Sequence, residues 1–273
     1  MVFGALASQG RVGRTTLLWS LACLLAEKQE TVLYEIDVAF PKLLSFFPEE
    51  GEPVKRRLTE IDPSKCTLVG KCFEVCNFGV IKREDGRVFH RRRLCRGCGA
   101  CREVCPQRAI VWEETESGKI IKVRNGNLIL YAGKLAPEEG WEGYLARKLK
   151  EVYPILPEKP TLIKAPLGLS TLSLRTVKEA EGLLLVTCLH PGLEDEIKIF
   201  GEILQGFGLP GGIVLSFVEE VPEEVSELVR SLGLQIWPIP LLRTLSPGQS
   251  LFEAEGSLRS RLEEILALGG GVA

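Results

Sequence analysis

The sequence predicts an α/β fold with a mostly parallel sheet and a small cysteine-rich module inserted into it. Apolar runs alternate with amphipathic helical patterns, a glycine-containing loop follows the first apolar run, and seven of the nine cysteines lie between Cys66 and Cys105. With 273 residues, 45% of them hydrophobic, the chain can bury a full core and still host the module. We therefore expect a main domain of residues 1–58 and 116–273 and an inserted α+β domain of residues 59–115.

The apolar runs place the strands and helices of the main domain. The strands are expected at residues 2–7, 31–36, 161–163, 183–186 and 212–215. A helix is expected at residues 15–27, and amphipathic patterns follow the later strands. Such alternation is typical of parallel strands that helices cover on both faces. Between two further apolar runs, Asn125-Gly126 predicts a tight β-hairpin.

The charge and hydropathy patterns exclude several classes of partner. The chain has 34 Lys and Arg residues against 36 Asp and Glu residues, so no overall field favours nucleic acid or an anionic membrane. The first residues carry no basic leader, and no apolar run approaches the roughly 18 residues that a membrane span needs. We expect a cytoplasmic protein that binds neither nucleic acid nor membrane.

The second half of the cysteine block carries a specific motif. Cys95, Cys98, Cys101 and Cys105, followed by Pro106, have the spacing C-x2-C-x2-C-x3-C-P of bacterial ferredoxins. Three thiolates on one tight loop can surround a cubane cluster, while the fourth points toward a second cluster. Zinc is the alternative, but zinc sites favour separated pairs of ligands. The spacing therefore favours an iron–sulfur module.

The first half of the block has the same frame with one ligand missing. Cys66, Cys72 and Cys76 keep the spacing, but Val69 stands where the second cysteine belongs. Since the fourth cysteine of each run serves the other cluster, we expect one complete [4Fe-4S] cluster, with the ligands Cys76, Cys95, Cys98 and Cys101. The second set is then Cys66, Cys72 and Cys105.

Three thiolates leave several outcomes for the second set. They can hold a [3Fe-4S] cluster, or a labile [4Fe-4S] cluster with one iron open to water, a small ligand or a partner's side chain. The alternative is an empty site whose cysteines only pack. The two remaining cysteines, Cys23 and Cys188, lie in apolar contexts and are expected to be small core residues.

The glycine loop after the first strand resembles a known phosphate-binding loop. Residues 8–16 read Ser-Gln-Gly-Arg-Val-Gly-Arg-Thr-Thr and resemble the deviant Walker A loop of the MinD/ParA/Mrp ATPases, G-K-G-G-x-G-K-T-T. Residues 35–38 resemble the D-x-D segment of that family, residues 162–168 its I-I-D-x-P-x-G switch, and residues 239–240 its late I-P pair. The resemblance implies a P-loop domain, and a subgroup of the family carries an inserted two-cluster ferredoxin at this position.

Departures from the family pattern fall on its charged residues. The Walker lysine is replaced by Arg14, and the lysine that reaches across the family's dimer by Gln9. A loop glycine has become Arg11, and the switch aspartate has become Lys164. Because phosphoryl transfer needs positioning and charge stabilisation together, we do not expect the isolated chain to hydrolyse ATP, and no catalytic residue is assigned.

The retained loop residues leave nucleotide binding open. The candidate nucleotide-binding residues are Gly10, Gly13, Arg14, Thr15, Thr16 and Asp37. One interpretation is a structural relic; the other is weak binding of ATP, ADP with Mg²⁺, or another anion. Lys164 is expected either to contact a phosphate or replace the lost cation, or to be solvated or ion-paired within the protein.

Two hypotheses of different class follow. In the first, the chain is an iron–sulfur protein for electron transfer or cluster handling, built on a degenerate MinD-type scaffold. In the second, it is an active ATPase of this type that gates its own clusters. The resemblance implies a dimer, either a homodimer or a heterodimer with a paralogous, intact P-loop ATPase subunit. A redox partner protein is expected in addition.

Overall fold

A nine-stranded sheet organises the chain in the computed structural model, which describes residues 1–84, 87–137, 139–242, 246 and 248–268. The strand order is β11-β10-β9-β1-β8-β2-β7-β6-β3. The strands are β1 (Val2–Leu6), β2 (Thr31–Glu35), β3 (Glu52–Ile61), β6 (Ile110–Asn125), β7 (Leu128–Leu135), β8 (Thr161–Lys164), β9 (Gly182–Cys188), β10 (Gly211–Ser216) and β11 (Gln235–Ile239). Pairing is parallel from β11 to β7 and antiparallel at β6 and β3. The predicted mostly parallel α/β fold is confirmed.

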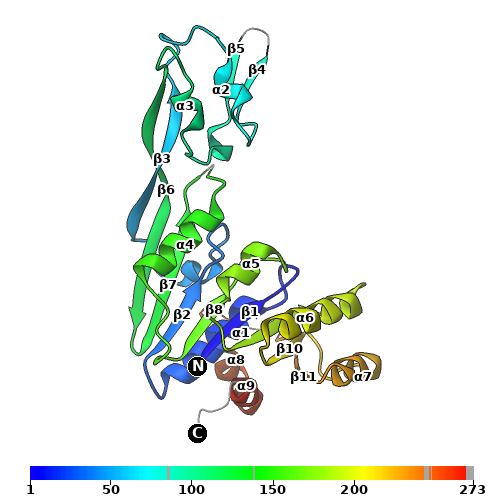
Figure 1. Cartoon of the computed structure of the whole chain (residues 1–273). Coiled ribbons are helices and arrows are strands. Elements are labelled where there is room, and N and C mark those ends of the chain that lie inside the picture. The colour runs from blue at the N-terminus through cyan, green and yellow to red at the C-terminus, as the bar shows by residue number, and fades with distance from the viewer. Residues whose placement is uncertain (85–86, 138, 243–245, 247, 269–273) are drawn as a thin grey trace.

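Helices cover both faces of this sheet (Figure 1). One layer consists of α1 (Arg14–Ala26), α8 (Leu251–Ala254), α9 (Leu258–Ala267) and the 3₁₀ turn η1 (Lys42–Phe46). The other consists of α4 (Glu142–Val152), α5 (Thr171–Thr176), α6 (Leu193–Phe207) and α7 (Glu223–Ser231). Two separate apolar cores result, one on each side of the sheet.

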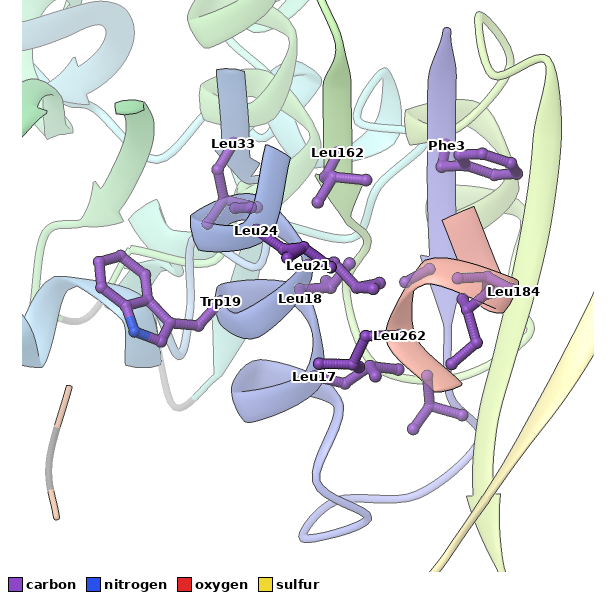
Figure 2. Close-up of a cluster of buried hydrophobic side chains, with 14 of the residues drawn as sticks. Phe3, Leu17, Leu18, Trp19, Leu21, Leu24, Leu33, Leu162, Leu184 and Leu262 are labelled. Carbon is purple, nitrogen blue, oxygen red and sulfur yellow. The ribbon is translucent and has the colours of Figure 1, made fainter. Parts of the chain in front are cut away.

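The first core forms around α1, whose leucines point into the sheet (Figure 2). Leu17, Leu18 and Leu21 are buried against Phe3 and Leu184 of the central strands. Each such side chain contributes about 1.5–3 kcal/mol on burial. This packing fixes the start of α1, and therefore the loop before it, relative to the ends of the strands.

The inserted module lies at the end of a two-stranded ribbon made by β3 and β6. These strands pair antiparallel from Glu52 with Ile120 to Ile61 with Ile110, and Figure 1 shows the module at the far end of the ribbon. The module contains α2 (Lys71–Glu74), the hairpin β4 (Ile81–Glu84) and β5 (Arg87–His90), the turn η2 (Arg92–Leu94) and α3 (Ala100–Glu103). The predicted boundaries, at residues 59 and 115, lie within the ribbon strands and stay predictions.

The ribbon strands differ most from the sequence-based expectation. No strand is predicted for β3, and β6 is predicted only near residues 119–123. Much of each strand is exposed in the ribbon, so both faces of the ribbon carry polar residues. The alternation of apolar and polar residues that identifies a half-buried strand is therefore missing there. The hairpin at Asn125-Gly126 is present, with Gly126 at φ 57°.

The carboxyl ends of the parallel strands meet at one edge of the sheet, where such folds place their ligands. The loop of residues 7–13 follows β1 there, Asp37 follows β2, and Lys164 ends β8.

The helices in the described part of the chain include none with the length and apolar character of a membrane span.

Candidate functional site

The module is built from two equivalent halves offset by 29 residues in sequence, as the pair Cys66 and Cys95 illustrates. Gly70 and Gly99 have φ of 97° and 79° and precede the short helices α2 and α3. Cys76 and Cys105 each accept a backbone hydrogen bond from the residue three positions later, at 3.0 and 3.1 Å. Val69 therefore occupies the backbone position that Cys98 occupies in the other half.

The predicted complete set surrounds one cavity. Its lining includes Cys76, Cys95, Cys98 and Cys101. Cys95 and Cys101 are buried, whereas Cys98 is exposed. The structure thus brings the fourth cysteine of the first run together with three cysteines of the second run, which is the crosswise sharing that the spacing predicts.

Neighbouring hydrogen-bond donors favour the thiolate form of Cys95. Gly97 N lies 3.4 Å from Cys95 Sγ, and Thr59 Oγ1 lies 3.5 Å from it. Burial raises the pKa of this thiol, but the neighbouring His90 ring and the Thr59 and Gly97 donors outweigh it, and the pKa falls to about 6. A lowered thiol pKa favours the deprotonated form that metals bind. The Cys101 thiol, by contrast, has its pKa raised by burial.

The three-cysteine set surrounds a second cavity. Cys66, Cys72 and Cys105 line it together with Val69. Ala109 N donates to Cys105 Sγ at 3.4 Å. Val69 is 51% exposed, so the position of the missing ligand faces solvent rather than the core. Leu68 takes φ 58°, as Gly97 takes 63° in the other half, so the loop keeps its shape although a side chain replaces the glycine.

The two cavities fit the expected clusters better than a single metal ion. Among the described residues, no three His, Cys, Asp or Glu side chains converge on a point that could hold one ion. Instead, each set of cysteines is distributed around a volume, as ligands of a polynuclear cluster are, and the donors are all thiolates. Ile81 and Ile110 lie between the two sets in a small apolar core.

The phosphate loop keeps its backbone shape. Gly13 is left-handed, with φ 77°, and directly precedes α1. Arg11 also takes a left-handed conformation, with φ 65°, which costs a residue with a Cβ about 1–2 kcal/mol. Gly10 is exposed, and Thr15 and Thr16 are half-buried in the first turn of α1. The loop therefore resembles a P-loop in its backbone conformation.

The buried charged side chains beside this loop pair with one another within the chain. Lys164 Nζ lies 2.7 Å from Glu35 Oε1 and 3.4 Å from Asp37 Oδ2, and Arg14 Nη2 lies 3.6 Å from Asp37 Oδ2. Arg14 also donates to the Pro166 carbonyl at 3.3 Å. All four charged residues are buried. We call these four residues, Arg14, Glu35, Asp37 and Lys164, the buried ion cluster.

The buried ion cluster does not fit a Mg²⁺–nucleotide complex. The carboxylate of Asp37, which would polarise a water near the metal, already faces two cations. Burial raises the pKa of Glu35 and lowers that of Arg14, and the opposite charges of the cluster reduce both shifts. The guanidinium of Arg14 contacts Asp37 and the Pro166 carbonyl, so it is engaged within the chain.

Gln9 also makes its contact within its own chain. Its amide lies 3.5 Å from the Cys188 sulfur at the end of β9. The neighbouring Ser8 N donates to Glu196 at 3.3 Å, and Glu196 accepts from His190 Nε2 at 2.8 Å. The position that in the resembled family reaches across a dimer is therefore packed against the body of the same protomer. Cys23 and Cys188, which are predicted to be core residues, are partly buried and pack against the first core.

Some functional contacts are not predicted from the sequence. Arg56 forms two hydrogen bonds of 2.8 Å with Glu139 and donates a third of 2.8 Å to the carbonyl of Cys95. Arg96 stacks on Trp141, with its guanidinium carbon 3.8 Å from the ring centroid. These contacts join the ligand loop of the complete set to the segment before α4.

Comparisons with known proteins match both the inserted module and the main domain. Residues 65–110 match the family described as the 4Fe-4S dicluster domain. Over 71 residues the chain is 38% identical to the IorA subunit of indolepyruvate oxidoreductase from Methanothermobacter marburgensis. That match covers 26% of this chain and 11% of that protein, so the chain spans about a tenth of the relative's length.

Solved structures match the whole chain at low identity. A McdA variant from Cyanothece bound to ATP has a TM-score of 0.55 at 16% identity and covers 98% of this chain and 96% of its own. MinD from Pyrococcus horikoshii with Mg-ADP has a TM-score of 0.56 at 13% identity and covers 98% and 93%. At such identities the match shows the fold alone. The chain thus has a MinD/ParA-like P-loop fold with an inserted 4Fe-4S dicluster ferredoxin domain at residues 65–110.

Proposed function

We propose that the chain is an iron–sulfur protein that transfers electrons or handles clusters, and that its P-loop scaffold works without its own nucleotide. The observation that carries the proposal is the sorting of seven cysteines into two cavities, each lined by cysteines from both runs. The family match of residues 65–110 implies two iron–sulfur clusters. An iron–sulfur cluster of this kind accepts and returns single electrons at potentials that its surroundings set.

The two cavities are proposed to hold unequal clusters. Cys76, Cys95, Cys98 and Cys101 would hold a robust [4Fe-4S] cluster. Cys66, Cys72 and Cys105 would hold a [3Fe-4S] cluster or a labile [4Fe-4S] cluster whose fourth position opens at Val69. The named relative is a subunit of an oxidoreductase, and its similarity covers only a segment of this chain, so it supports an electron-transfer role for this module without specifying a substrate.

The scaffold is proposed to lack ATP hydrolysis. The buried ion cluster supports this, because Lys164 and Arg14 neutralise the carboxylates that would otherwise face Mg²⁺. The retained loop backbone favours a second candidate, an ATPase that gates its own clusters. The two are separated by phosphate release and by equilibrium binding of Mg-ATP to the anaerobic protein. We expect no turnover. Turnover at rates typical of enzymes, lost on Thr15→Ala, would favour the second candidate.

The working unit is proposed to be a heterodimer with a related, intact P-loop subunit. Large apolar side chains are exposed at the carboxyl edge of the sheet, in the segments after β2, β8, β9, β10 and β11; they are Phe40, Leu167, Leu189, Phe217 and Leu241. They flank the phosphate loop, where the resembled family forms its dimer. A homodimer would place Gln9, which contacts its own Cys188, at both nucleotide sites. An intact partner would keep its own lysine and aspartate.

Native mass spectrometry tests this assembly. The protein is purified anaerobically through a tag on this chain at its native expression level. A one-to-one complex with a second P-loop protein is expected. Recovery of monomer or homodimer alone would count against the heterodimer, and it would leave the iron–sulfur role to be decided by the redox measurements.

A further inference from the structure

One side of the module combines exposed arginines with aromatic rings around the only exposed cysteine that the described residues contain. Arg57 lies over Trp112 at 5.0 Å, and Arg96 lies over Trp141 at 3.8 Å and over Phe78 at 5.1 Å. We call this surface, made of Arg57, Phe78, Arg96, Trp112 and Trp141, the Cys98 face.

The residues on either side of Cys98 pack closely on the ribbon strands. A Cβ at Gly97 would lie 2.4 Å from the Arg57 carbonyl oxygen, and a Cβ at Gly99 would lie 2.8 Å from the Trp112 ring. The two residues flanking Cys98 thus pack directly on the ribbon strands that carry Arg57 and Trp112. Arg96 lines both the cavity of the complete set and the adjacent surface groove. The face and the predicted cluster ligands are therefore one continuous structure.

The Cys98 face is positively charged although the chain is not. The formal net charge of the chain is −2. Four basic residues, Lys55, Arg56, Arg57 and Arg96, line the adjoining groove of about 450 Å³. Lys55 is paired with Glu114 and Arg56 with Glu139, so Arg57 and Arg96 carry the excess positive charge. Within the described part of the chain, no carboxylate lies within salt-bridge distance of Arg57 or Arg96. Their guanidinium groups are stacked but remain available to an external carboxylate.

We propose that the Cys98 face is the docking surface for an acidic electron-transfer protein. Arginine and tryptophan dominate the energetic centres of protein interfaces, because they combine large contact area with directional hydrogen bonds. A stacked guanidinium keeps a rigid set of donors that matches a carboxylate. Opposite charge also accelerates encounter between the two proteins. Trp141 precedes α4 in the main domain, so the partner would contact both the module and the scaffold.

This inference rests on the proposed electron-transfer function. One electron would pass from the reduced acidic protein, which is oxidised, to the centre beside Cys98, which is reduced, and no bond would form or break. The proposed contact surface does not include the second, three-cysteine cavity. In the lining of that cavity, Lys71 is the one basic or acidic side chain, so the cavity lacks the arginines of the Cys98 face.

The first arm of the test measures binding. A plant-type [2Fe-2S] ferredoxin, which has an acidic surface, is titrated calorimetrically into the full anaerobic chain at 20 and 300 mM NaCl. We expect the dissociation constant to be at least tenfold larger at the higher salt, because salt screens the attraction between exposed charges. Arg57→Glu with Arg96→Glu should weaken binding at least tenfold at low salt. Arg57→Lys with Arg96→Lys keeps the charge but loses the stacked guanidinium donors, so it should weaken binding by less than the charge reversal does.

A matched control reverses two charges elsewhere. Lys198→Glu with Arg230→Glu changes the net charge equally on α6 and α7, away from the module, and should leave the affinity within about twofold. Absence of binding by the unaltered chain at low salt, or equal weakening by both pairs of reversals, would overturn the proposal. A third result would also overturn the proposal. If a single-stranded oligonucleotide bound more tightly than the ferredoxin, and Arg57→Glu with Arg96→Glu abolished that binding, the Cys98 face would be a nucleic-acid site.

The second arm separates the docking surface from the proposed function. Dithionite and titanium(III) citrate, which need no docking, should reduce the unaltered chain and the Arg57→Glu, Arg96→Glu variant to the same extent. Reduction of both with no difference in ferredoxin affinity would defeat the docking surface and leave the proposed function intact. Failure of both reagents to reduce the unaltered chain would defeat the proposed function itself.

Discussion

The inserted module and the phosphate loop have diverged from their motifs in opposite ways. In the module the ligand residues survive with one exception, and seven thiols line two cavities. In the phosphate loop the backbone shape survives, with Gly13 left-handed before α1, but the charged residues have changed and neutralise one another. A site that loses a ligand can keep much of its chemistry, whereas in the phosphate loop the cations Arg14 and Lys164 are already paired with carboxylates of the same chain.

The largest expected effect is the loss of one cluster at a time from the module. Cys101→Ser should abolish the signal of the complete cluster and leave the other, and Cys72→Ser should do the reverse, because the two residues line different cavities. Iron content and EPR of anaerobic protein check this. Thr15→Ala, in the phosphate loop, is the control and should change neither signal. Loss of both signals in each cysteine variant would mean that the cavities are not independent.

Restoring the missing ligand should make the two halves of the module alike. Val69→Cys places a thiol at the backbone position equivalent to Cys98, and this position is exposed in both halves. We expect a second four-iron signal and slower loss of iron in air. Val69→Ser, of similar size but without a thiol, is the matched control and should not have this effect. An unchanged second signal in Val69→Cys would contradict the equivalence of the halves.

Breaking the buried ion cluster should affect stability rather than iron. Lys164→Met leaves Glu35 with no cation in contact, and removing one member of a buried ion pair costs about 3–5 kcal/mol. Lys178→Met removes an exposed lysine and should cost less than about 0.5 kcal/mol. Denaturant unfolding of both variants checks the difference. Equal stabilities would show that the cluster does not hold the phosphate loop.

The smallest expected effect is a pH dependence near the phosphate loop. Hydrogen bonding to Glu196 raises the pKa of His190 above its ordinary value of 6.5. The protonated pair therefore stabilises the folded state below about pH 6.5, and this contribution disappears as the pH rises through the raised pKa. His190→Gln should lower the melting temperature at pH 5.5 by at most about 2 °C, because the pair is partly exposed, and by less at pH 8.5. Lys198→Gln should show no such trend.

Local patterns predicted the parts of the fold that depend on neighbouring residues. Hydrophobic runs and the Asn125-Gly126 turn placed the strands and the hairpin, and cysteine spacing sorted the ligand sets that the structure brings together. The ribbon strand β3 escaped prediction, because its residues are largely exposed and show no periodic burial.

Contacts between distant residues could not be predicted in the same way. Lys164 pairs with Glu35 across 129 positions, and Arg56 with Glu139 across 83. Arg56 and Glu139 are unremarkable in their local sequence, and only the folded chain brings the members of each pair together. The lysine at position 164, in place of the switch aspartate, indicates a changed site. Its contact with Glu35 depends on the folded chain and has no signal in the local sequence.

The central claim, two unequal iron–sulfur clusters on a scaffold that does not use nucleotide, is tested most directly by EPR of anaerobically purified protein before and after stepwise reduction. The account predicts two distinguishable signals, one from a robust four-iron cluster and one from a three-iron or labile cluster, both unchanged when Mg-ATP is added. Two equivalent, fully cysteine-ligated four-iron signals, or signals that shift with Mg-ATP, would contradict it.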